Sequence, residues 1–362
     1  MKKVIFLSLI SVLIVSILSS CRPPELEGAF VDYGAGRIDK ALELAKEATE
    51  KYPANPEAPF LLGKIYADKE QYDKMVEAFD ESLNRGDAHK KEIQDLKNYH
   101  FQALFNEGAK KYNAYTKLED RTSEKATKTL ESAIDKFQNA LLIKEDYKAN
   151  ELTAFCYTLL DKKEKALPHY KNMTEVQPDT AHAWISLANY YYNNSEYDKS
   201  NKNLKKAIEI DPDNEEAIAL LAQTYDMQDQ RDQAIKYYSK AIEVNPDEKA
   251  YPFNLGLLYI KATSSDTTLD QETKTDYYKQ ASKNFGKVTE LDPEMKDPFK
   301  LKAQAEIQLK KFEEGLETAN RALEYFPEDG ELWFLKSVCL SNLNQKDDAE
   351  EAYERAKQLG YE

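Results

Sequence analysis

Five prolines recur at a nearly constant spacing through the second half of this 362-residue chain. Pro178, Pro212 and Pro246 stand 34 residues apart, Pro293 follows after 47, and Pro327 after another 34. A period of 34 residues fits two short antiparallel helices with their connections, and 47 is that period plus 13. Because such a helix pair can bury its apolar face only against its neighbours, the spacing predicts an all-α array of stacked helix-turn-helix repeats.

The side chains between these prolines repeat as well. Trp184, Leu187, Ala188 and Tyr191 fall at i, i+3, i+4 and i+7, which is one stripe along a helix. Small residues suit the positions where two helices approach closely, and aromatic residues fill the wider gaps. The next repeat has the same kinds of residue in the same order, at Leu221, Ala222, Tyr225, Ala234, Tyr238 and Ala241.

This order of aromatic, Leu, Gly or Ala, Tyr, Ala, aromatic, Ala and Pro resembles that of the tetratricopeptide repeat (TPR) family. Other repeats match it at Leu62, Gly63, Tyr66 and Phe79, at Tyr157, Ala166, Tyr170 and Pro178, at Leu255, Gly256, Tyr259, Ala281, Phe285 and Pro293, and at Trp333, Ala349, Tyr353 and Ala356. The resemblance covers roughly residues 22–362. It implies a right-handed superhelix of about nine repeats, and it is specific to the fold rather than to any activity.

The expected domain organisation is a signal at 1–20, a tether at 21–28 and the superhelix at 29–362. The repeats are expected near residues 22–55, 56–89, 101–146, 147–180, 181–214, 215–248, 249–295, 296–329 and 330–362. The first is degenerate, because the pattern of its first helix is weak. Residues 90–100 fit as an extension that leads into the long third repeat.

Two repeats are longer than the others in the same way. Phe105 and Gly108 align with Phe253 and Gly256 at an offset of 148, which places 13 extra residues near 115–127 and near 263–275. Both inserts are polar. They have two interpretations, a lengthened hairpin or loop without a task and a pair of protrusions that contact a partner.

The N-terminus carries a targeting signal. Lys2 and Lys3 precede an apolar run that is too short for a bilayer span but suits an export signal. The run ends in Leu18-Ser19-Ser20-Cys21, which resembles the lipobox of bacterial lipoproteins. The resemblance implies cleavage before Cys21 and acylation of that residue, and Arg22 after it favours the outer membrane. An ordinary secretory signal and an uncleaved anchor are the alternatives.

The charge limits the kinds of partner. The chain has a net charge of −15, and loss of residues 1–20 removes two lysines and no acid, which gives −17. Such an acidic body repels phosphate backbones, so nucleic-acid binding is not expected. It also repels anionic lipid headgroups, so a lipid on Cys21 would have to hold the protein at a membrane.

No constellation for catalysis stands out. The four histidines are in no metal-ligand spacing, and the acids lie at salt-bridge spacing on helices, so neither a metal, a cofactor nor a small-molecule substrate is expected. Cys156 and Cys339 are 183 residues apart, too far in a repeat array for a disulfide, and are expected to be buried thiols. We therefore do not expect an enzyme.

In TPR proteins, positions 2, 5, 9 and 12 of each first helix line the concave face. Carried onto this chain, they form an apolar and aromatic set that suits a peptide or a partner helix. The alternative is that these residues pack between repeats. The set comprises Phe60, Phe105, Tyr112, Phe155, Ile185, Asn189, Tyr192, Phe253, Leu257, Ile260 and Phe334, with Phe253, Leu257 and Ile260 as its best patch. The carboxylate clamp of chaperone-binding TPR domains is not matched, since Ile185, Leu220, Ala250 and Asn254 occupy its positions.

These observations favour a non-catalytic scaffold that is anchored by Cys21 in the cell envelope, at the outer membrane facing the periplasm, and that docks an envelope protein. The alternative function is a glycan- or nutrient-binding lipoprotein of an uptake system. The two polar inserts look too small for the sugar platform of such proteins.

Overall fold

The computed structural model describes residues 22–266 and 268–361. Within these ranges the secondary structure is entirely helical, which confirms the all-α prediction. The chain divides into two compact units, an N-terminal unit (Met1–Gln177) and a C-terminal unit (Pro178–Glu362). The right-handed superhelix expected for the whole chain stays a prediction.

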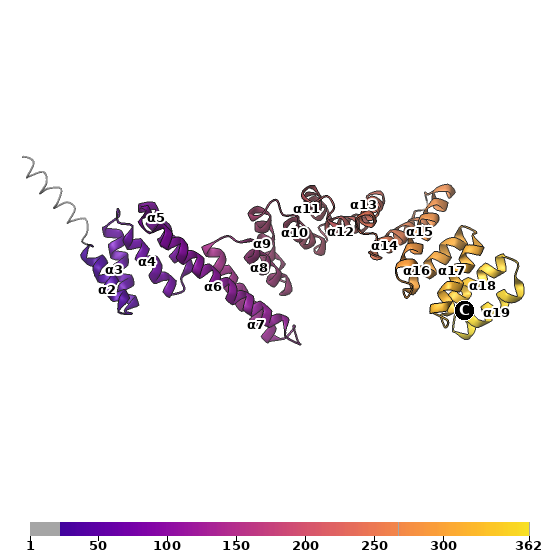
Figure 1. Ribbon diagram of the computed structural model, residues 1–362, viewed down its shortest axis with the longest axis horizontal. Coiled ribbons are helices and arrows are strands. Elements are labelled where there is room, and N and C mark those ends of the chain that lie inside the picture. Colours follow the sequence, from indigo (N-terminus) through magenta and orange to yellow (C-terminus); the bar gives the residue numbers. More distant parts are fainter. Residues whose placement is uncertain (1–21, 267, 362) are drawn as a thin grey trace, which may run out of the picture. The chain divides into compact units, whose positions relative to one another are not determined.

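Each unit consists of consecutive antiparallel helix pairs (Figure 1). The N-terminal unit contains α2 (Pro24–Gly34), α3 (Ile38–Lys51), α4 (Glu57–Asp68), α5 (Tyr72–Arg85), a 3₁₀ turn (Asp87–His89), α6 (Lys90–Thr116), α7 (Glu124–Ile143), α8 (Tyr147–Leu159) and α9 (Lys163–Val176). The C-terminal unit contains α10 (Ala181–Asn193), α11 (Tyr197–Ile210), α12 (Glu215–Met227), α13 (Arg231–Val244), α14 (Ala250–Ser265), α15 (Gln271–Leu291), α16 (Lys296–Gln308), α17 (Phe312–Tyr325), α18 (Gly330–Asn342) and α19 (Lys346–Gln358).

The short turns inside the pairs share one backbone conformation. In the described residues, seven pairs turn through three residues, and the middle residue has a positive φ of 53–73° at Gly36, Glu70, Asp161, Ser195, Asp229, Lys310 and Asn344. The third residue donates its N–H to the carbonyl five residues earlier, as Gln71 does to Tyr66 at 2.9 Å. This bond caps the C-terminal end of the first helix, and the chain then reverses direction into the second helix.

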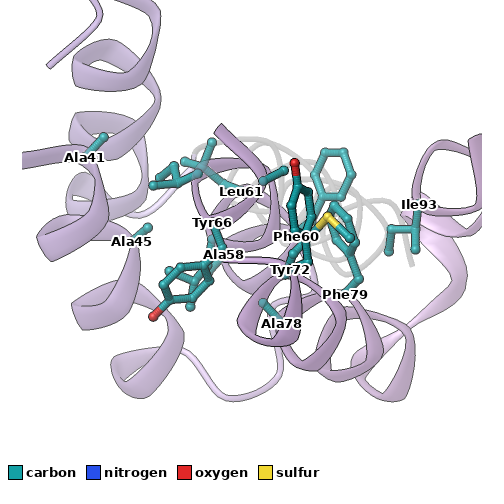
Figure 2. Close-up of a cluster of buried hydrophobic side chains, with 14 of the residues drawn as sticks. Ala41, Ala45, Ala58, Phe60, Leu61, Tyr66, Tyr72, Ala78, Phe79 and Ile93 are labelled. Carbon is teal, nitrogen blue, oxygen red and sulfur yellow. The ribbon is translucent and has the colours of Figure 1, made fainter. Parts of the chain in front are cut away.

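A glycine facing a phenylalanine sets the closest approach in three of the pairs. A Cβ built on Gly63 would stand 2.4 Å from the ring of Phe79, and one on Gly108 or Gly256 would stand 2.7 Å from the ring opposite. Phe79 is completely buried in the core of the N-terminal unit (Figure 2). The small residues of the repeat pattern therefore let a large ring on the second helix lie directly against the backbone of the first.

The two long repeats are long because their helices are long. The extra residues extend α6 and α14 at their C-terminal ends and α7 and α15 at their N-terminal ends, so that the loops between them span only residues 117–123 and 266–270. Ser123 and Asp270 cap the second helices by accepting from the N–H groups of Ala126 and Thr273. The inserts thus form lengthened hairpins; whether they contact a partner stays a prediction.

The N-terminal end differs from the expected tether at 21–28. From Pro24 onward this segment is helix α2, which packs on α3 although its sequence pattern is weak. Leu26 and Ala29 are completely buried in that contact, and proline at the first helical position suits a helix start. The expected signal at 1–20 and Cys21 lie outside the described residues.

Among the helices that the structure describes, none combines the length and apolar character that a membrane span needs. Cys156 and Cys339 are both free thiols with no exposed surface, as expected. Burial raises the pKa of the Cys156 thiol to about 12 and that of Cys339 to about 11.

Candidate protein-binding face

The candidate site is the predicted partner-binding face of the first helices within each unit. Two residues predicted for it belong to the core instead. Phe60 is 5% exposed and Ile185 is 1% exposed, and each lies in a buried cluster. They are buried because the neighbouring helices cover them, which the position within a single helix does not reveal.

In the N-terminal unit the predicted residues gather into an aromatic patch made of Phe105 and Tyr112 on α6 and Phe155 on α8. Phe155 is 46% exposed, and its ring meets that of Tyr112 edge to face at 6.3 Å between centroids. Phe105 is half-buried and packs on the core residue Phe137 at 5.7 Å. Burial raises the pKa of the Tyr112 hydroxyl, in keeping with a ring that is only partly open to solvent. Of the three rings, Phe155 is the exposed one and contacts Tyr112, whereas Phe105 packs on the core.

In the C-terminal unit Phe253, Leu257 and Ile260 on α14 form an apolar patch. Leu257 is 37% exposed. Phe253 and Ile260 are half-buried against the cluster that contains Phe285, with 6.0 Å between the centroids of the Phe253 and Phe285 rings. Leu257 is thus the exposed side chain of this patch, and Phe253 and Ile260 anchor the patch to the core.

The remaining predicted residues join neither patch. Asn189 donates to Glu216 at 3.5 Å, and the half-buried Tyr192 lies 5.8 Å from Tyr197 between ring centroids. The Phe334 ring lies 5.2 Å from that of Tyr361, so residues near the C-terminus cover part of it. These three positions are partly occupied by contacts within the chain.

Ion pairs tie neighbouring first helices together on this face. Lys261 of α14 reaches Asp226 at 3.2 Å and Asp229 at 3.0 Å, at the end of α12 and in the turn after it. Lys300 of α16 reaches Asp329 at 3.0 Å and Glu331 of α18 at 2.7 Å, and these carboxylates raise its pKa against the opposing effect of burial. The Lys261 pairs are exposed and add little stability, whereas the Lys300 pairs are largely buried; both sets connect neighbouring first helices.

One feature of the surface is missing from the sequence-based predictions. A hollow of about 770 Å³ opens at the end of the first helix pairs, lined by Pro23, Tyr52, Pro53, Pro56, Ala88 and His89 among others. Its residues come from the residue before α2, the connection between α3 and α4, and the 3₁₀ turn before α6, and none of these segments was predicted to form a site. In the residues that the structure describes, no group of His, Cys, Asp or Glu is arranged to hold a metal ion.

Consecutive helix pairs that stack in this way define a repeat scaffold for protein–protein interaction. Two models of the tetratricopeptide repeat match the chain, one over residues 194–252 and the other over residues 31–89 and 300–360. The chain is a tetratricopeptide repeat protein. Folds of this family typically serve as non-catalytic interaction scaffolds.

Several solved structures are similar to about half of this chain. A crystal structure of MamA is 18% identical and covers 50% of this chain and 92% of its own, with a TM-score of 0.42. MamA residues 41 to the end from Desulfovibrio magneticus RS-1 are 19% identical and cover 52% and 96%, with a TM-score of 0.40. YrrB, described as a TPR protein with an unusual peptide-binding site, is 21% identical and covers 54% and 95%, with a TM-score of 0.42. No curated protein matches the chain.

Proposed function

We propose that this protein is a lipid-anchored scaffold of the bacterial cell envelope, which docks a protein partner on its first-helix face and is held at the outer membrane through Cys21. The observation that carries the docking is an exposed apolar side chain on a first helix of each unit, Phe155 in contact with the Tyr112 ring and Leu257 beside the core-packed Phe253 and Ile260. An apolar side chain that is exposed but held in place can be buried by a partner at little entropic cost. The lipobox carries the anchoring.

Removal of the lipidation site tests the anchor. Cys21→Ser is expected to move the protein from the membrane fraction to the soluble fraction, because the acidic body has no other attraction to anionic lipid. Detergent-phase partitioning followed by immunoblotting measures this. A C21S protein that stayed in the detergent phase would exclude lipid anchoring at this residue.

Truncation of the exposed side chains tests the docking face. Photo-crosslinking from positions 155 and 257 in intact cells identifies the partner, whose purified form is then titrated against Phe155→Ala and Leu257→Ala. Each substitution is expected to weaken binding by about 5- to 100-fold, the loss typical of an apolar interface anchor.

Leu291 provides the matched control, because it is 38% exposed, like Leu257, but lies at the end of a second helix. Leu291→Ala is expected to bind the partner as the unchanged protein does, and all variants should keep their helical circular dichroism. Equal losses for L257A and L291A would argue against the first-helix face. Capture of a glycan rather than a protein would favour the nutrient-uptake alternative.

A further inference from the structure

The hollow at the end of the N-terminal unit lies next to the start of the described chain. Pro23, immediately before α2, lines it together with Tyr52, Pro53 and Pro56 from the connection between α3 and α4. The ring of His89 forms another wall and stacks flat on Phe60, with 4.1 Å between the ring centroids. We call the surface around this hollow the end face.

The side chain of Arg22 holds the start of the described chain on the end face. The Arg22 guanidinium donates from Nε to Glu57 Oε1 at 2.9 Å, and a terminal nitrogen lies 2.7 Å from the same oxygen. Its carbon also lies 4.1 Å from the centre of the Phe30 ring. Arg22 is therefore held by contacts with Glu57 and Phe30, and it directly follows the proposed lipid attachment site in the sequence.

The end face carries little unpaired charge. Lys51 and Glu57 are the lysine and the carboxylate that line the hollow, and each has an opposite partner, Glu25 for Lys51 and Arg22 for Glu57. Tyr52 donates its hydroxyl to Glu25 at 2.7 Å. In a chain with a net charge of −15, a surface of prolines, aromatic rings and paired charges repels anionic headgroups little.

We propose that the end face rests directly on the bilayer, with the hollow turned towards the lipid headgroups. The inference depends on the lipid attachment at Cys21 described above. Once the lipid is inserted, Cys21 lies at the level of the headgroups, and the clamp at Arg22 brings the end face to the same level. Amphipathic rings such as Tyr52 suit that depth. The lipid therefore holds the N-terminal helix pairs directly against the membrane.

A depth-reporting fluorophore tests the contact. The full-length lipoprotein with Ala54→Cys, an exposed position that lines the hollow, is labelled with an environment-sensitive dye and reconstituted into vesicles of phosphatidylethanolamine and phosphatidylglycerol that contain a nitroxide-headgroup lipid. Cys156 and Cys339 are buried and do not take up the label. Ala114→Cys is the matched control, because Ala114 is also exposed but lies about 36 Å along α6 from Lys90.

The expected result is at least about twofold stronger quenching of the dye at position 54 than at position 114. Equal quenching at the two positions, or none at position 54, in a protein that still fractionates with the vesicles would overturn the end-face contact and leave the anchor intact. A labelled protein that fails to fractionate with vesicles at all would instead refute the lipid anchor of the proposed function. The two failures are therefore distinct.

Discussion

At the scale of single residues, the contact of Gly63 with Phe79 carries much of the packing in its helix pair. Gly63→Ala places a methyl group 2.4 Å from a fully buried ring, so the pair must move apart. We expect a net loss of about 1–2 kcal/mol in the free energy of unfolding, since overpacking of this kind outweighs the better helix propensity of alanine. Urea unfolding followed by circular dichroism measures it.

Gly34 is the matched control for that substitution. It is a helical residue of the same unit, and a Cβ built on it meets nothing within 4 Å. Gly34→Ala should therefore be neutral or stabilising by up to about 1 kcal/mol. If both alanine variants were equally stable, the close approach of ring and backbone would not be limiting.

At the scale of the helix pair, the turns store strain in their middle residues. Lys310 has φ of 58°, a left-handed conformation that an L side chain adopts at a cost, and its side chain is exposed. Lys310→Gly is expected to stabilise the protein by about 0.5–1 kcal/mol, the steric relief less the greater freedom of glycine in the unfolded chain. A shift of the urea midpoint reports it.

Lys310→Ala separates strain from charge, because it removes the same lysine but keeps a Cβ in the left-handed conformation. It should bring no such gain. A gain of the same size in K310A would show that the lysine charge, rather than backbone strain, limits stability at this turn.

At the scale of the whole molecule, the two buried cysteines report on the two units separately. Burial raises the pKa of both thiols far above neutral, so neither should react with an alkylating agent at pH 8 until the repeat around it opens. Because Gly63 and Cys156 lie in the same compact unit and Cys339 lies in the other, Gly63→Ala should lower the urea concentration at which Cys156 becomes reactive and leave that of Cys339 unchanged. Mass spectrometry of the labelled peptides measures both, and equal shifts would mean that the chain unfolds as one cooperative block.

The predictions made from the sequence were most accurate where the structure is local. The 34-residue spacing predicted antiparallel helix pairs, and Gly63, Gly108 and Gly256 recur where a ring packs. Helix periodicity and small-residue positions depend on residues close in the sequence, so a single chain reveals them. The first helix α2 was underestimated, since its stability comes from packing on α3 rather than from a strong pattern of its own.

What the sequence by itself determined is therefore the helical repeat, while the side of each first helix that faces a partner stays a prediction. The tertiary structure decided which of those positions remain open: Phe155 and Leu257 are exposed, whereas Phe60 and Ile185 are covered. It also decided that three connecting segments form a hollow beside the clamped Arg22. The reason is that exposure depends on the neighbouring helices and connections, and these are set by packing between repeats rather than by the periodicity within one.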